Sequence, residues 1–239
     1  MKKPDYELLL ILGGVLLLCY LYTTPKAYAA KKAKGAPKAG GAKAGGGKKL
    51  VNKGGRVIKS PKVRLIFWGN WATATPTMAQ IDTAYRNLMA STYFNVLLEY
   101  GGGKPVYLGY VNNKATPPKG FKDPDLTKAV STMYPVNDPN TIYCVLPQPG
   151  TKAADKVGDA YHDVFSGRGI AVYYGKYDMA SIMKAMSEEI AESVIDPDDA
   201  AWHTSSDDQI GDLCANVFTI NGVTVEGLWS NAKGACTTA

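Results

Sequence analysis

Cysteine is scarce in this chain, with four residues among 239. No Cys-x-x-Cys pair and no Cys/His cluster with zinc-finger spacing occurs, which excludes a structural zinc module of that kind. Four cysteines in a chain of this length also exclude a disulfide scaffold. Cys214 and Cys236, which flank the C-terminal segment, are the pair that could form a bridge, and two free buried thiols are the alternative.

The common nucleophile and phosphate-binding motifs are also missing. No G-x-S-x-G sequence occurs, and the segment GGGKP at 101–105 lacks the spacing of a phosphate-binding loop, so it predicts a turn before a strand. Cys144 lies in an apolar run, where burial would raise the pKa of the thiol and weaken it as a nucleophile. These absences disfavour serine hydrolase, nucleotide hydrolase and cysteine hydrolase chemistry.

Positive charge is outnumbered by negative charge in the main domain. Residues 1–64 hold 15 Lys or Arg against two acids, a net charge of +13, whereas residues 65–239 hold 12 against 19, a net charge of −7. A basic arm therefore precedes an acidic domain. Because the sign of that domain is wrong for phosphate, we expect no sequence-specific binding of nucleic acid.

An uncharged apolar run, residues 8–22, stands near the start of the chain. As a helix it would be about 22 Å long, short of the roughly 30 Å hydrocarbon core of a bilayer. It fits either a cleaved signal peptide or a membrane anchor. Ten Lys or Arg and no acid follow between Lys26 and Arg56, and such a run resists translocation. We therefore predict that residues 1–30 anchor a single-pass membrane protein whose domain lies on the cytosolic side or faces a capsid, with secretion as the alternative.

Residues 31–56 consist mainly of Lys, Ala and Gly and show no apolar periodicity. This composition predicts a flexible tether. The cationic stretch from 26 to 56 could contact anionic lipid or the acidic surface of a protein partner, or it could act only as a soluble spacer.

The remaining residues, 57–239, predict one globular domain of the α/β or α+β class in three layers, because strand-like and helix-like segments roughly alternate. The predicted strands are 62–71, 104–112, 140–148 and 167–177. The predicted helices are 75–98, a short helix near 123–134, and a long helix over 178–195.

The long helix carries Glu188, Glu189 and Glu192. In a His-Glu-x-x-His metalloprotease helix the corresponding positions supply a metal ligand, a general base and a second ligand, with the ligands one turn apart. Carboxylates suit Ca²⁺, Mg²⁺ or Mn²⁺ better than Zn²⁺. Such glutamates are most often a solvated face. Ten acids and one base between 178 and 212 make that less certain, because charges packed so densely would repel unless they remain solvated or share a cation.

Six short segments in order carry a resemblance to a known family. They are IFWGNW at 66, STYFNVLLEYGG at 91, AYHDVF at 160, SEEIAE at 187 with DP at 196, QIGDLC at 209 and LWSNAKGAC at 228. Over about 62–236 the chain resembles the exordium, or phosphate-induced protein, family, especially its secreted bacterial relatives. The resemblance implies one compact α/β domain with a metalloprotease-like helix.

The resemblance also implies a site. His162 matches the histidine of the family and Asp212 its Gly-Asp, while Glu188 stands where relatives carry a histidine and Gln209 where many carry an acid. The remaining constellation would be His162, Glu188, Glu192 and Asp212 as metal ligands with Glu189 as the general base. Without the resemblance, His162 would be a strand-end or loop residue bonded to the backbone, and His203 is expected on the surface.

Two functions follow from this pattern. The first is a membrane-tethered structural or binding protein with a degenerate metallohydrolase-like domain, such as a virion or envelope component with a protein partner. The second is a metal-dependent hydrolase in which Glu189 activates a water on a cation held by carboxylates.

Overall fold

The computed structural model describes residues 49–238. The anchor or signal segment expected at 8–22 and most of the expected tether lie outside the described residues. Within 49–238, no helix is both long enough and apolar enough to cross a membrane.

A five-stranded sheet with the order β3-β2-β5-β8-β7 forms the centre of the domain. Its strands are β2 (Lys62–Trp68), β3 (Val106–Asn113), β5 (Thr141–Pro147), β7 (Ala160–Phe165) and β8 (Arg168–Tyr173). The pairs β2–β3, β2–β5 and β5–β8 are parallel, and β7 runs antiparallel to β8 at one edge. The four predicted strands are therefore confirmed with small changes at their ends, whereas β7 was not predicted.

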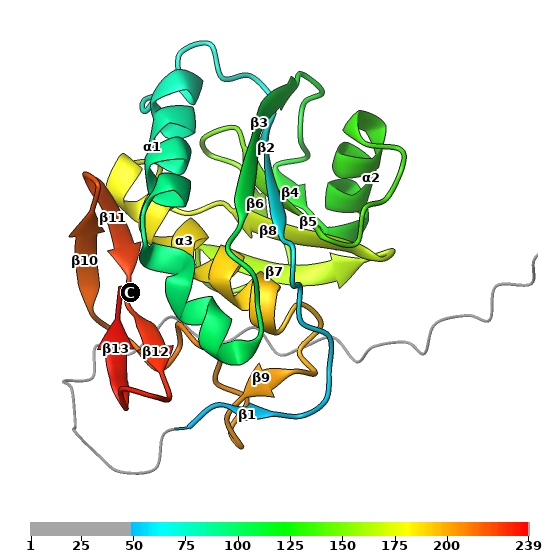
Figure 1. Ribbon diagram of the computed structural model, residues 1–239. Helices are drawn as coiled ribbons and strands as arrows, with labels where there is room; N and C mark the ends of the chain where they lie inside the picture. Colours follow the sequence, from blue (N-terminus) through cyan, green and yellow to red (C-terminus); the bar gives the residue numbers. More distant parts are fainter. Residues whose placement is uncertain (1–48, 239) are drawn as a thin grey trace, which may run out of the picture. The chain divides into compact units, whose positions relative to one another are not determined.

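Helices cover both faces of this sheet (Figure 1). They are α1 (Met78–Ala90), the 3-10 helix η1 (Tyr93–Tyr100), α2 (Asp123–Met133) and α3 (Met179–Ile195). Alternate residues of β2 point to opposite faces: Leu65 and Phe67 join the core under α1 and α3, and Ile66 joins the smaller core under α2. The expected mixed α/β class is confirmed.

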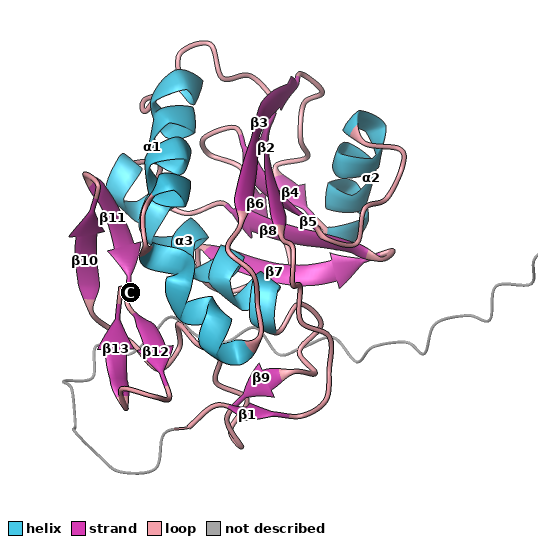
Figure 2. Ribbon diagram, viewed as in Figure 1, coloured by secondary structure: helices cyan, strands magenta, loops and turns pink. Residues whose placement is uncertain are grey.

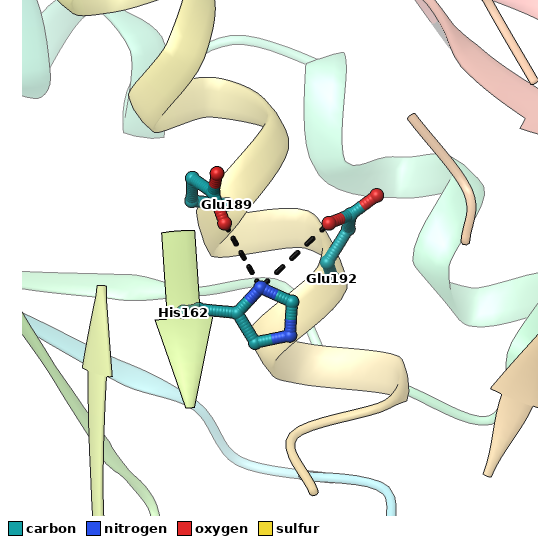
Figure 3. A group of neighbouring side chains, drawn as sticks. All are labelled: His162, Glu189 and Glu192. Carbon is teal, nitrogen blue, oxygen red and sulfur yellow. Dashed lines mark hydrogen bonds and ion pairs between the residues drawn. The ribbon is translucent and has the colours of Figure 1, made fainter. Parts of the chain in front are cut away.

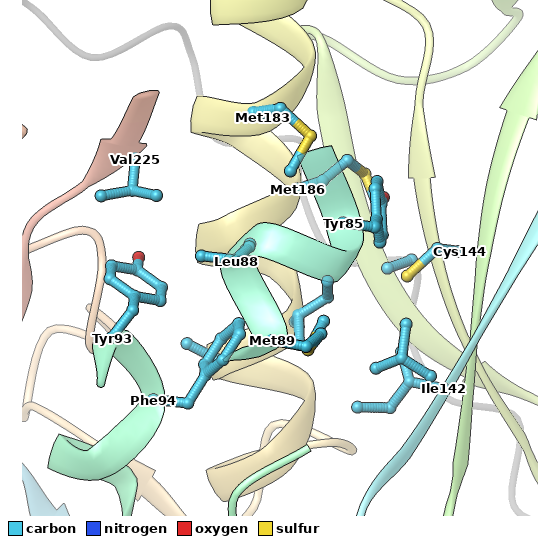
Figure 4. Close-up of a cluster of buried hydrophobic side chains, with 14 of the residues drawn as sticks. Tyr85, Leu88, Met89, Tyr93, Phe94, Ile142, Cys144, Met183, Met186 and Val225 are labelled. Atoms are coloured by element: carbon cyan, nitrogen blue, oxygen red, sulfur yellow. The ribbon is translucent and has the colours of Figure 1, made fainter. Parts of the chain in front are cut away.

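The larger core is built from α1, η1, α3 and one face of the sheet (Figure 4). Met183 and Met186 of α3 pack there with Tyr85 and Leu88 of α1. Cys144 of β5 is fully buried in the same core, and this burial raises the pKa of its thiol well above the ordinary value. Cys144 is therefore a packing residue with little thiolate character, as the sequence predicts.

Short strand pairs surround the central sheet (Figure 2). They are β1 (Val51–Asn52) with β9 (Trp202–His203), β4 (Gly120–Phe121) with β6 (Lys152–Ala153), β10 (Val217–Ile220) with β11 (Val223–Glu226), and β12 (Leu228–Ser230) with β13 (Ala235–Thr237). Cys214 and Cys236 form a disulfide, which decides between the two alternatives that the sequence left open. The bridge joins the loop before β10 to the last strand.

The prediction of a single helix over 75–98 is wrong, because the structure has two helices there, α1 and η1. α1 ends at Ala90 because the Ser91 hydroxyl donates a hydrogen bond to the Leu88 carbonyl oxygen at 2.6 Å and accepts one from the Tyr93 N–H at 3.1 Å. A serine that bonds the neighbouring backbone in this way competes with helical hydrogen bonds. The chain continues as η1 at a new angle.

The prediction of a flexible tether over 31–56 is wrong for its last residues, which bond to the globular domain. Leu50 is fully buried, and the Asn231 side chain bonds both its N–H and its carbonyl oxygen. Further along, the Lys53 N–H donates to the Ala201 carbonyl oxygen at 2.7 Å. Because these partners lie about 150 to 180 positions away in the chain, local composition could not show them.

α3 follows the sequence prediction closely. The Asp178 side chain accepts a hydrogen bond from the Ser181 N–H and caps the helix start. Asp196 follows the last residue, and Pro197 cannot continue the helix. The buried side is continuous from Ile182 to Ile195, so the position of the glutamates relative to the sheet is determined by apolar packing.

Candidate functional site

His162 lies in the middle of β7, where it pairs with Ala171 of β8. The expectation of a strand-end or loop histidine bonded to the backbone is therefore wrong. Its ring points toward α3 (Figure 3). An extra antiparallel strand at the sheet edge thus brings this side chain under the long helix.

The His162 ring contacts two glutamates of α3. Its Nδ1 lies 2.9 Å from Glu189 Oε2 and 3.6 Å from Glu192 Oε2, so the first contact is a hydrogen bond and the second an ion pair (Figure 3). The three side chains are 5%, 10% and 7% exposed, respectively. This group, His162, Glu189 and Glu192, is the buried trio.

Burial of the His162 ring would lower its pKa, but the hydrogen bond to Glu189 and the charges of Glu189, Glu192 and Asp199 outweigh it and raise the pKa to about 9. At neutral pH the ring is therefore an imidazolium. One positive charge lies between the two carboxylates of the buried trio.

Gln209 supplies a second donor beside this trio. Its Nε2 lies 3.2 Å from both Asp196 Oδ2 and Asp199 Oδ1, and 3.5 Å from His162 Nε2. An amide nitrogen carries two hydrogens, and the nearer carboxylate oxygens take both of them. The amide therefore satisfies two carboxylates that an acid at this position would repel.

A second group shares Glu192. Oxygen atoms of Glu188, Glu192 and Asp212 all lie within 4.8 Å of one another, and we name this group the open trio because Asp212 is exposed. The Gly211 N–H donates to Glu192 Oε1 at 3.2 Å. A Cβ on Gly211 would lie 2.4 Å from Glu188 Cγ, so only glycine fits beside that side chain.

Glu188 is surrounded by acids. Burial raises the pKa of its carboxyl well above the ordinary value, and the charges of Glu192, Glu226 and Glu189 raise it further. Glu226, at the end of β11, pairs with Lys184 at 3.1 Å. The carboxyl of Glu188 therefore keeps its proton to a higher pH than an exposed glutamate.

The structure brings all five candidate residues together, as two trios that meet at Glu192. The sequence did not predict that three further acids lie beside the trios: Asp196, Asp199 and Glu226. The acid-rich stretch from 178 to 212 was a signal for the first two, but no pattern pointed to Glu226 on a distant strand. His203, expected on the surface, has a side chain only 15% exposed, and its Nδ1 lies 3.3 Å from Asp207 Oδ1.

The two trios differ in what they can do chemically. A general base must be free to take a proton from water, and Glu189 instead accepts a hydrogen bond from a buried imidazolium. The open trio offers only carboxylate oxygens, which suit hard cations such as Ca²⁺ or Mg²⁺.

No protein-family model, no curated protein and no solved structure matches the chain. The resemblance to the exordium family stays a prediction that rests on the six segments alone.

Proposed function

We propose that this chain is a membrane-tethered structural or binding protein whose domain carries a degenerate metallohydrolase-like centre. The observation that carries the proposal is the hydrogen bond between Glu189, the residue at the general-base position, and His162. A proton on the imidazole ring supplies the positive charge that a metal ion would supply in an active enzyme. The buried trio thus holds a positive charge of its own between its two carboxylates, which leaves less attraction for a metal ion.

Gln209 supports the same proposal. The amide donates to Asp196 and Asp199, so it compensates carboxylates through hydrogen bonds instead of adding a further negative charge to attract a cation. Glu188 and Gln209 are the two positions where the chain departs from the family that it resembles. Both departures remove a ligand type suited to zinc, since imidazole is lost at one and a carboxylate at the other.

Metal analysis of the purified full-length chain tests the proposal. We expect no stoichiometric divalent ion in the wild type. The variant Glu188→His with Gln209→Glu returns an imidazole and a carboxylate to the site, and we expect it to bind about one Zn²⁺ per chain. Ala180→His is the matched control, because it adds an imidazole to an exposed position of the same helix, two turns away from the trios.

A stoichiometric ion in the wild type that is lost in Glu192→Ala would contradict the proposal. It would favour the second candidate, a metal-dependent hydrolase, which is supported by the convergence of three carboxylates in the open trio. A site of this composition lowers the effective charge of the metal and acidifies bound water less than a histidine-rich one. We expect such an enzyme to be slow.

The tethering part of the proposal rests on the sequence of residues 8–56. Alkaline extraction of membranes that contain the full-length chain should leave it in the pellet, whereas a chain without residues 8–22 should be released. Binding of the released chain to vesicles of anionic lipid should weaken as salt rises from about 0.05 to 0.5 M, because the attraction of the basic segment is screened. Binding that is independent of salt would contradict a role for the lysines.

A further inference from the structure

A depression of about 430 Å³ lies at the edge of the sheet where the parallel strands end. Its walls come from the loop after β2 (Asn70, Thr73 and Thr75), the loop after β5 (Gln148) and the segment after β8 (Tyr177). The loop between β2 and α1 crosses the top of the domain in Figure 1. None of the five candidate residues of the two trios lines this depression.

The topology of the sheet explains this position. From β2 the chain runs to α1 on one face, and from β5 it runs to β6, where Ala153 packs against the core on the other face. Where the connections of two neighbouring parallel strands leave to opposite faces, they leave a crevice just outside the carboxyl ends of those strands. Ligands of open α/β sheets bind in this crevice, and the size of the depression is within the range of small-molecule sites.

A hydrogen bond joins two of the loops that form the walls of the depression. The Asn70 N–H donates to Gln148 Oε1 at 2.7 Å and ties the loop after β2 to the loop after β5. Gly69 permits this approach, since its φ is +107° and a Cβ there would lie 2.4 Å from Gln148 Oε1. The conformation of Gly69 and the Gln148 side chain therefore hold the two loops together at this depression.

Several hydrogen-bonding groups of the wall are available. The hydroxyls of Thr73 and Thr75 and the Nε2 amide group of Gln148 have no hydrogen-bond partner among residues 49–238. The Tyr177 hydroxyl donates to the Pro147 carbonyl oxygen, which holds its ring in place as an aromatic wall. Beneath it, the ring of Trp71 packs against Tyr177 at 5.6 Å between centroids.

Among residues 49–238, no charged residue lines the depression. Lys176 and Asp178, which flank Tyr177 in the chain, pair with each other at 3.1 Å. The N-terminus of α1 is also occupied, because Thr77 and Gln80 form a reciprocal capping box there. An anionic ligand would therefore meet neither a free cation of the lining nor a free helix end.

From this geometry we infer that the depression binds a neutral carbohydrate. Sugar hydroxyls both donate and accept hydrogen bonds, which matches two threonine hydroxyls and an amide, and the apolar face of a sugar ring suits the Tyr177 side chain. An extended peptide fits less well, because β2 and β5 are interior strands with both edges paired and cannot accept another strand.

The test uses the full-length chain labelled with ¹⁵N at tryptophan, which gives four indole signals, from Trp68, Trp71, Trp202 and Trp229. Maltotriose, cellotriose and chitotriose are titrated separately, with trigalacturonic acid as the anionic comparison. We expect at least one neutral trisaccharide to shift the Trp71 signal saturably, with a dissociation constant of about 1 mM or tighter. The Trp202 and Trp229 signals and the titration with the acid should show no such change.

The variant Thr73→Val with Thr75→Val removes two exposed hydroxyls without a change in size, and we expect it to bind about tenfold more weakly. Thr219→Val, at an exposed position of β10, is the matched control and should bind as the wild type does. Thermal unfolding of all three proteins shows whether the fold is kept. No shift of Trp71 at about 10 mM of any neutral sugar, or equal affinity of the double variant, overturns the inference.

Discussion

The buried trio and the open trio include residues from the same turn of α3 and share Glu192. They differ in how the repulsion between neighbouring carboxylates is reduced. In the buried trio a protonated histidine lies between two glutamates. In the open trio the carboxyl of Glu188 lies among other acids, and burial and their charges raise its pKa. Glu188 and Glu189 are adjacent on one helix, yet the groups around their carboxyls differ in charge because different strands and loops face them.

Removal of the imidazolium should have the largest effect. His162→Ala leaves two buried carboxylates without their cation, and we expect the free energy of unfolding to fall by about 3–5 kcal/mol, measured by urea denaturation. His203→Ala is the control and should cost less than about 1 kcal/mol, because its partner Asp207 is 71% exposed. Equal losses in the two variants would remove the contrast between the trios.

Stability should also depend on pH through His162. The folded-state pKa of about 9 is higher than the 6.5 of an unfolded histidine. The folded protein thus holds this proton more tightly, so the stabilisation is complete below about pH 6.5 and is lost as the pH rises through 9. The difference corresponds to about 3 kcal/mol.

Urea denaturation at several pH values measures this loss. His162→Gln stays neutral at every pH and should lack this component of the loss between pH 7 and 9.5. If the free energy of unfolding changed with pH in the same way for the wild type and His162→Gln, the pKa of His162 would not be raised in the folded state.

Gly211→Ala tests the packing of the open trio. The added Cβ would overlap Glu188 Cγ, and we expect a loss of about 2 kcal/mol in the free energy of unfolding. Glu188→Ala in the same chain should relieve the overlap, so the two changes should be non-additive in a double-mutant cycle. Gly120→Ala is the control, because its Cβ would meet only ordinary contacts, the nearest 3.4 Å away.

Glu188→Gln should have the smallest effect on the free energy of unfolding. Unlike the variants above, it should stabilise the protein at neutral pH. Because the pKa of Glu188 is raised, the unfolded carboxyl ionises at a lower pH than the folded one, so the wild type loses stability as the pH rises above about 4.5. The glutamine variant avoids this loss. It should match the wild type near pH 4 and be more stable at pH 7 by about 1 kcal/mol, measured by urea denaturation. Asp155→Asn, at an exposed carboxylate, is the comparison for a change of charge alone.

Much of the framework could be read from local patterns. The apolar stripe and the capping residue predicted α3 to within one residue, and the four parallel strands were recognised as strand-like segments. The errors lie where distant partners decide. Ser91 interrupts the expected first helix, Asn231 binds Leu50 at the end of the expected tether, and β7 forms because it can pair with β8.

Helical periodicity alone implied that Glu188 and Glu192 share a face and that Glu189 lies beside them, because the spacing of side chains on a helix is a local property. Only the folded chain decided that Glu189 meets a charged His162 while Glu188 meets Glu192, Glu226 and Gly211. The charge state of each carboxyl depends on burial and on neighbours that come from β7, β11 and the loop before β10. Those neighbours are distant in sequence and near only in space.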